Sequence, residues 1–258
     1  MIATLRFSLV MATLLAALML PQSAFFDVRR IVVTGAHTLL PEDVAATAGV
    51  QYGRPLFAVR PAEATARLQA HPRIRAARVQ VRWPETVVID LTERVPRLAV
   101  RVGPRYALVA DDDVVVALAD GPGGLPWLDD RAGRTAGVRP GARIASPTMR
   151  AMHVVVEALP EAMRARLLRV IVQDGGDLVV EFAPGLLVRA AVRADLAERL
   201  ALLPRALEAL QARGIVAKVI DLRYAGSLVV TPWREGDGPQ VWNSRPDLGA
   251  GDSITHYR

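Results

Sequence analysis

Side chains that could do chemistry are spread thinly along this chain of 258 residues. Its four histidines lie far apart and at no spacing that a metal site uses, and there is no cysteine to act as a thiolate ligand or nucleophile. The sequence motifs of serine hydrolases, zinc peptidases and Ser-x-x-Lys enzymes are all missing. The residue types therefore favour a protein without catalysis, without a metal and without a cofactor.

Two short runs look like ligand loops but lack the residues that such loops need. The run Asp111-Asp112-Asp113 places carboxylates side by side, whereas a calcium loop spaces its oxygen ligands at alternate positions and adds a distant acid. The glycines of residues 121–124 are not followed by the Gly-Lys-Ser/Thr sequence that holds nucleotide phosphates. Both runs are predicted to be turns.

The chemistry that the sequence does offer is recognition, and it is concentrated in residues 219–230. This run is predicted to be a β-strand with an irregularity at residues 225–227 and further strand beyond it. As the last strand before a polar tail, it is expected at a sheet edge, where unpaired backbone groups can pair with a strand of a partner. We expect the backbone beside Gly226, Ser227 and Leu228 to make that contact.

Two side chains of this run are predicted to bind the partner directly. Arg223 is expected to pair with an acidic group of the partner, and Tyr224 to supply amphipathic contact area of the kind found at interface hot spots. The alternative is that Tyr224 lies in the core and that Arg223 forms a surface pair with Asp221.

The part of the chain that precedes this strand begins with an apolar N-terminal segment. Residues 7–26 carry no charged side chain and just reach the roughly 20 residues of a helix that spans a bilayer. We predict a transmembrane signal-anchor there, with residues 1–6 as a short cytoplasmic stub and the remainder in the periplasm. A cleaved signal peptide is the alternative, but Gln22 occupies a position where a cut after Ala24 requires a small residue.

The net charge of +6 comes from arginine, since Lys218 is the only lysine. Arginines and acids are interspersed along the chain, without a dense basic block or interleaved aromatic residues, so nucleic-acid binding is not expected. The excess of positive charge suits a protein that lies beside anionic lipid.

Residues 27–96 are predicted to form a small α/β domain in the order strand, helix, helix, strand, strand. Helices are indicated after Pro41 and Pro61, and residues 78–92 read as a hairpin with one buried face. Two helices packed on a three-stranded sheet would satisfy this order.

Residues 97–233 are predicted to form a β-rich domain with one or two helices, and residues 234–258 a disordered tail. One helix is expected after the capping residue Ser146. The other is expected to begin at Asp195 as its capping residue, to carry a leucine stripe, to kink at Pro204 and to end at Gly214. The predicted fold class is therefore α+β behind a transmembrane helix.

Three sequence features, taken in order, resemble one known family. His71-Pro72-Arg73-Ile74 leads into the predicted hairpin, Glu93-Arg94-Val95-Pro96 closes it, and Asp221-Leu222-Arg223-Tyr224 precedes a tryptophan at position 233. Together they resemble the FtsQ/DivIB family of bacterial cell-division proteins, whose first periplasmic domain is a POTRA domain. The resemblance adds Trp233 to the residues expected to bind a partner.

Membership of that family implies a bitopic divisome scaffold at the septal inner membrane, without catalytic activity. It further implies that the FtsB/FtsL coiled-coil pair binds near the C-terminal strands and that other division proteins bind the POTRA domain. Two other classes remain open at this point. One is a periplasmic hydrolase tethered to the membrane, and the other is a POTRA-bearing component of a translocation system.

Overall fold

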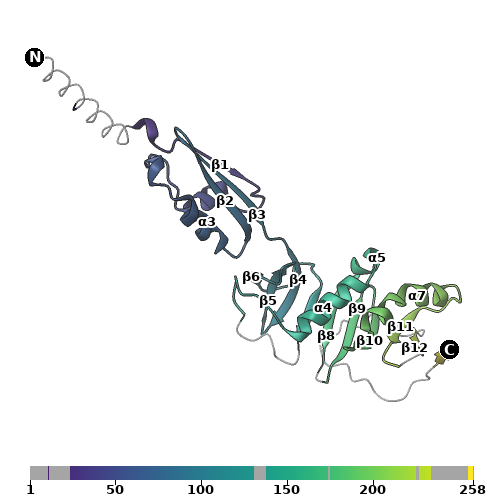
Figure 1. Ribbon diagram of the computed structural model, residues 1–258. Helices are drawn as coiled ribbons and strands as arrows, with labels where there is room; N and C mark the ends of the chain where they lie inside the picture. Colours follow the sequence, from purple (N-terminus) through teal and green to yellow (C-terminus); the bar gives the residue numbers. More distant parts are fainter. Residues whose placement is uncertain are drawn as a thin grey trace, which may run out of the picture. The chain divides into compact units, whose positions relative to one another are not determined.

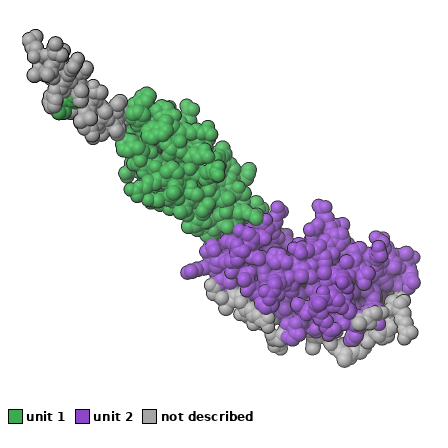
Figure 2. All heavy atoms as spheres, in the orientation of Figure 1, with its two compact units in different colours: residues 1–95 green, residues 96–258 purple. Residues whose placement is uncertain are grey.

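The computed structural model describes Met11 and residues 24–130, 138–173, 175–224, 227–233 and 255–257. It divides into two compact units, residues 1–95 and residues 96–258, which Figure 2 shows in different colours. Each unit has its own hydrophobic core, which among the described residues begins at Val28 in unit 1 and at Leu98 in unit 2.

Of the predicted anchor at residues 7–26, the structure describes only Met11 and the 3-10 turn η2 (Ala24–Phe26). Within the described part of the chain, no helix combines the length and the apolar character needed to cross a bilayer. The anchor and the stub at residues 1–6 therefore stay predictions, since they lie almost wholly outside the described residues.

The described residues of unit 1 form a three-stranded sheet with two α-helices packed on it (Figure 1). The strand order is β1-β3-β2, with β1 parallel and β2 antiparallel to β3. The predicted order of strand, helix, helix, strand, strand is confirmed. The elements are β1 (Arg30–Thr34), α2 (Pro41–Ala48), η3 (Leu56–Ala58), α3 (Pro61–Gln69), β2 (Ile74–Arg82) and β3 (Thr86–Glu93).

Local sequence explains why the helices of unit 1 begin where they do and which faces they bury. Pro41 and Pro61 occupy the first turns of α2 and α3, where a backbone N–H has no partner within the helix to lose. Each helix then buries two residues spaced by four positions, which therefore share one face. These residues are Val44 and Ala48 in α2 and Ala64 and Leu68 in α3.

The turn between β1 and α2 depends on one glycine and one carboxylate. Gly35 has φ of +78°, and a Cβ atom there would lie 1.9 Å from the carbonyl oxygen of Leu91, so only glycine fits. The carboxylate of Glu93 accepts the backbone N–H groups of His37 at 2.8 Å, Thr38 at 3.0 Å and Leu39 at 2.9 Å. Residues 37–39 are thereby tied to the end of β3.

The same contacts set the ionisation of Glu93. Burial by itself would raise the pKa of Glu93, but the hydroxyl of Thr38 and the backbone N–H groups of residues 37–39 outweigh it and lower the pKa to about 2. The carboxylate is therefore charged in the folded unit over the whole physiological range.

The described residues of unit 2 form one mixed sheet of ten strands, in the order β13-β12-β11-β10-β9-β8-β7-β4-β5-β6. Helices α4 and α6 pack against each other, and the buried residues of α4, α6 and α7 join those of the sheet in one core (Figure 1). The elements are β4 (Pro96–Val102), β5 (Arg105–Ala110), β6 (Val115–Ala119), β7 (Trp127–Asp130), α4 (Pro147–Ala158), α5 (Glu161–Arg164), β8 (Leu167–Val172), β9 (Asp177–Phe182), β10 (Leu186–Ala191), α6 (Leu196–Ala201), α7 (Leu203–Gln211), β11 (Ala217–Asp221), β12 (Leu228–Pro232) and β13 (Thr255–Tyr257).

The predicted helix with the leucine stripe is two helices rather than one kinked helix. Pro204 lies in the first turn of α7, and the helix is interrupted before it at Leu202, which is 57% exposed. A proline without an N–H fits a helix start better than a helix interior, so the prediction of a kink gives way to a break. The stripe itself packs into the core, since Leu196, Leu200, Leu203 and Leu210 are buried.

We expect Glu93→Gln to destabilise unit 1 and to remove most of its acid sensitivity. The unfolded carboxyl has a pKa of about 4.3, so the contribution of Glu93 is complete above that pH and is lost as the pH falls from there through the folded value of about 2. At neutral pH, Glu93 contributes on the order of 3 kcal/mol to the free energy of unfolding. The measurement is urea denaturation of residues 24–95 at a series of pH values, followed by the fluorescence of Trp83, the only tryptophan of that fragment.

The matched control is Glu42→Gln, which changes an exposed acid in the first turn of α2. This variant should lose only a few tenths of a kcal/mol of helix-dipole interaction and should keep the acid sensitivity of the parent fragment. The same dependence of stability on pH in the Glu93→Gln variant as in the control would contradict the assignment.

Candidate partner-docking edge

The run at residues 219–230 is not the single interrupted strand that was predicted, but two antiparallel strands. β11 pairs with β12, and Ile220 lies opposite Val230. The physical reason is that the chain reverses between the two apolar runs, and a pattern of alternating residues does not reveal such a reversal. Ala225 and Gly226 are outside the described residues, so the predicted role of Gly226 stays a prediction.

Neither strand of this hairpin ends the sheet. β11 lies inside it, parallel to β10 on one side and antiparallel to β12 on the other. β12 has β13 on its outer side, where Leu228 lies opposite Tyr257. The expected free edge at β12 is thus occupied in the structure, because a short strand from within residues 234–258 pairs with it. The rest of that predicted tail lies outside the described residues.

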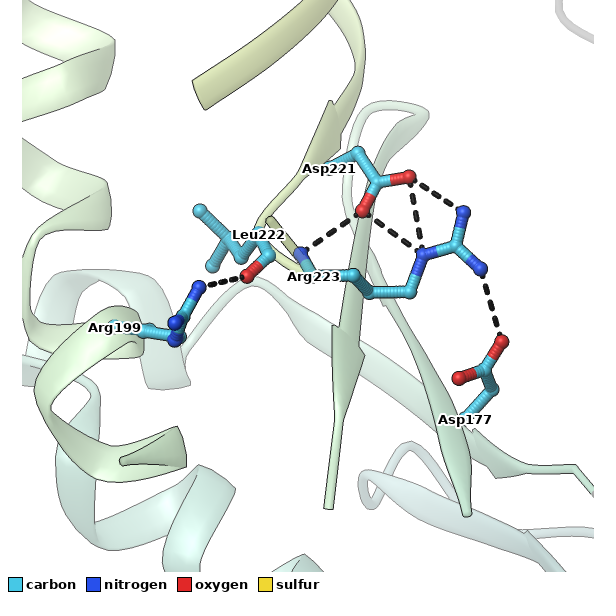
Figure 3. Close-up of polar contacts among 5 residues, drawn as sticks. All are labelled: Asp177, Arg199, Asp221, Leu222 and Arg223. Carbon is cyan, nitrogen blue, oxygen red and sulfur yellow. Dashed lines mark hydrogen bonds and ion pairs between the residues drawn. The ribbon is translucent and has the colours of Figure 1, made fainter. Parts of the chain in front are cut away.

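Arg223 does not present a free charge to a partner, because acids of its own chain surround its guanidinium (Figure 3). Its Nε lies 3.0 and 3.1 Å from the carboxylate oxygens of Asp221, and its Nη2 lies 2.7 Å from Oδ2 of the same residue. Its Nη1 donates to Asp177 at the start of β9 over 2.9 Å. Such bidentate pairs are stronger and more directional than simple ion pairs.

These contacts also fix the charge of Arg223. The hydrogen bond to Asp221 raises the pKa of Arg223, partial burial opposes that rise, and Asp177 adds to it. Arg223 thus pairs with Asp221 and Asp177, in part as the alternative from the sequence had it, and its predicted pairing with an acid of the partner stays a prediction. In this geometry Arg223 ties the end of β11 to the start of β9.

A second arginine, Arg199 of α6, holds the backbone that follows β11. Its Nη1 donates to the carbonyl oxygen of Leu222 over 2.7 Å, drawn in Figure 3, and to that of Tyr224 over 2.9 Å. Its Nε donates to the carboxylate of Asp195 over 2.6 Å. Asp195 is the N-cap residue of α6 as predicted, but its side chain makes no capping hydrogen bond and orients Arg199 instead, and the hydrogen bond from Arg199 lowers the pKa of Asp195.

Tyr224 is held by its backbone but is exposed through its side chain. The side chain is 55% exposed, and the Cζ atom of Arg223 lies 6.0 Å from the centre of its ring. The alternative that Tyr224 lies in the core is therefore wrong, and its side chain is available to contact a partner. Ser227 and Leu228 are half-buried, and Leu228 packs against the core of unit 2.

Trp233 lies at the other end of the hairpin from Tyr224. Its backbone N–H donates to the carbonyl of Val216 over 2.9 Å, and the Nζ atom of Lys218 lies 5.4 Å from the centre of its ring. A Cβ atom on Gly185 would come within 3.1 Å of its indole, so the ring closes over the turn between β9 and β10. The predicted site residues therefore do not form one cluster.

The run of three aspartates forms the turn that was predicted for Asp111–Asp113, and His153 lies 2.6 Å from the carboxylate of Asp113. Among the residues that the structure describes, no group of three or more His, Asp or Glu side chains is placed to hold a metal ion.

Two of the residues that brace the hairpin were missed in the sequence. Arg199 could have been noticed, since it follows Asp195 by four positions and such a pair shares one helix face. Asp177 lies 46 positions before Arg223, and no local pattern connects the two.

Comparison with known proteins shows what the chain is similar to. Residues 26–94 match the family described as "POTRA domain, FtsQ-type". The match covers nearly all the described residues of unit 1, whose strand and helix order it shares. Unit 1 is an FtsQ-type POTRA domain.

The FtsQ likeness extends into unit 2. "Cell division protein FtsQ" of Streptomyces collinus is 35% identical over 139 residues, which are 51% of this chain and 53% of that protein. The protein of the same name from Streptomyces bingchenggensis is 29% identical over 165 residues, 63% of this chain and 62% of that protein. That of Mycobacterium leprae is 36% identical over 103 residues, 40% of this chain and 30% of that protein. The chain is a homologue of these FtsQ proteins and matches less than two thirds of the length of each.

We expect Arg199→Met to loosen the turn after β11 without unfolding unit 2. Two carbonyl oxygens lose a charged donor, which costs about 1–3 kcal/mol. The measurement is hydrogen–deuterium exchange of peptides that cover residues 217–233, which should exchange faster than in the parent chain. Arg205→Met, which changes an exposed arginine of α7, is the control. Unchanged exchange in the Arg199 variant would show that the arginine does not hold the turn.

Proposed function

We propose that this chain is a non-catalytic divisome scaffold that links septal division proteins. The observation that carries the proposal is the FtsQ-type POTRA domain at residues 26–94. The relatives named cell division protein FtsQ, which match into unit 2, support division over the hydrolase and translocation alternatives. In this proposal residues 7–26 anchor the chain in the inner membrane at the septum, and both units lie in the periplasm.

The proposed docking site is the outer side of β12 together with Tyr224. A strand of the partner would pair with the backbone from Ser227 through β12, and Tyr224 would contact one of its side chains. Arg223 and Arg199 act as positioning residues, because their hydrogen bonds hold the hairpin rather than the partner. The partner proposed for this site is the FtsB/FtsL coiled-coil pair, and other division proteins would bind the POTRA domain.

The structure adds a condition to this docking mode. β13 already pairs with β12, so a partner strand has to take its place. A competing segment of the same chain acts at a high effective concentration and weakens the apparent affinity of any partner for that edge. Trp233, which closes the far end of the hairpin, would support the edge rather than contact the partner.

Tyr224→Ala is expected to weaken binding of the soluble FtsB/FtsL pair to residues 24–258 by about tenfold or more, as for an exposed aromatic hot spot. The measurement is a titration by isothermal calorimetry. Tyr52→Ala is the control, because it removes from unit 1 a tyrosine that is 66% exposed, against 55% for Tyr224. Parent-like affinity in a folded Tyr224→Ala variant would remove Tyr224 from the site, and absence of binding by the parent fragment would contradict the proposed partner.

Removal of residues 234–258 is expected to tighten the same interaction by about threefold or more, because it frees the outer edge of β12. His256→Pro provides a matched test in the chain of full length, since proline cannot donate to the strand ladder opposite Val229. Weaker binding in both variants would mean that the C-terminal segment is part of the docking site and not a competitor.

A further inference from the structure

In the described part of unit 1, the phenylalanine, tyrosine and tryptophan residues lie at one end. Between residues 24 and 95 the sequence has five, Phe25, Phe26, Tyr52, Phe57 and Trp83, which we call the aromatic collar. Four of them are exposed over half or more of their surface: 61% for Phe25, 66% for Tyr52, 50% for Phe57 and 60% for Trp83. Large aromatic side chains gathered in exposed positions mark an interaction surface.

Contacts between distant segments bring the collar together. The ring of Phe26 packs edge-on against those of Phe25 and Trp83, with ring centres 5.2 and 5.7 Å apart. Val28 donates its backbone N–H to Arg54 over 2.8 Å, which places the loop of Tyr52 and the short helix η3 beside the same segment. Figure 1 shows the turn between β2 and β3 at the same end of unit 1 as η2.

The collar is bordered by positive charge. Arg30, Arg54 and Arg82 are exposed at this end, and Arg29 lies 3.9 Å from Glu85. With Asp27 as the other acid beside the collar, four arginines face two acids, which leaves an excess of two positive charges. A surface of exposed aromatic rings and arginines is complementary to anionic lipid headgroups.

The position of the collar in the chain indicates that it contacts a lipid bilayer. The uncharged run of residues 7–26 ends within it, at Phe25 and Phe26. Rings of tryptophan, tyrosine and phenylalanine favour the boundary between headgroups and acyl chains, and arginine favours the phosphates above it. A bilayer into which the preceding residues insert therefore meets this end of unit 1 first.

We infer that the aromatic collar and its arginines form a membrane-binding surface of the POTRA domain, which rests on the anionic phospholipid of the bilayer that holds the proposed anchor. The inference rests on that anchor, which is part of the proposed function. It adds that unit 1 does not hang freely from residues 24–26 but is oriented with Trp83 and Tyr52 in the headgroup layer.

The test uses the full chain in phospholipid vesicles. Because the sequence has no cysteine, single cysteines can be placed and labelled with a bimane fluorophore at Gln51, beside the collar, or at Ala70, at the opposite end of β2. Nine strand residues separate the two ends by roughly 30 Å. With nitroxide-headgroup lipid in vesicles that contain phosphatidylglycerol, quenching at position 51 should exceed that at position 70 by about threefold or more.

Two comparisons separate a binding surface from simple proximity to the anchor. Trp83→Ser with Phe57→Ser in the labelled chain, or vesicles of phosphatidylcholine alone, should each reduce quenching at position 51 by at least about twofold. Quenching that is equal at both positions, or that neither comparison changes, would overturn the inference. Flotation of the chain with the vesicles is scored separately, so a chain that floats without this quenching refutes the collar alone, and a chain that does not float refutes the anchor.

Discussion

The carbonyl oxygens of Leu222 and Tyr224, which follow β11, both accept hydrogen bonds from Arg199, and these bonds hold the chain where it leaves β11 for β12. Leu222 is buried, and a buried carbonyl without a donor costs about 1–3 kcal/mol, so a donor at this point stabilises the turn. Arg199 provides that donor from α6, and α6 is held in turn by its packing on α4. The shape of the sheet at this side is thus set from the helical layer.

Both units satisfy backbone groups of an irregular segment with one charged side chain, which is an acid in unit 1 and an arginine in unit 2. In unit 1 the carboxylate of Glu93 collects the N–H groups that precede α2, and in unit 2 the guanidinium of Arg199 collects carbonyl oxygens that follow β11. In both cases a charged side chain from one element makes hydrogen bonds to the backbone of an irregular segment of another. Tyr224 owes its combination of a fixed backbone and an exposed ring to this device.

The sequence was informative where physical rules are local. Prolines at helix starts and alternating residues in the hairpin were sufficient to predict the elements of unit 1 and their order along the chain, but not that β3 lies between β1 and β2 in the sheet. They failed at residues 219–230, because two strands and a reversal carry the same apolar pattern as one long strand. They could not pair Arg223 with Asp177, which depends on the sheet order, and they could not place β13, which has three residues in a polar segment.

The parallel pairing of β10 with β11 has a consequence for the maturation of the chain. Because α6 and α7 connect β10 to β11, β11 is synthesised well after β10, yet it covers a side of β10 that is otherwise unpaired. A chain that is cut or stalled before Ala217 would expose that strand to aggregation and would also lack Tyr224 and β12. Under the proposed function, such an incomplete chain would therefore lack both the cover of β10 and the site that docks the partner.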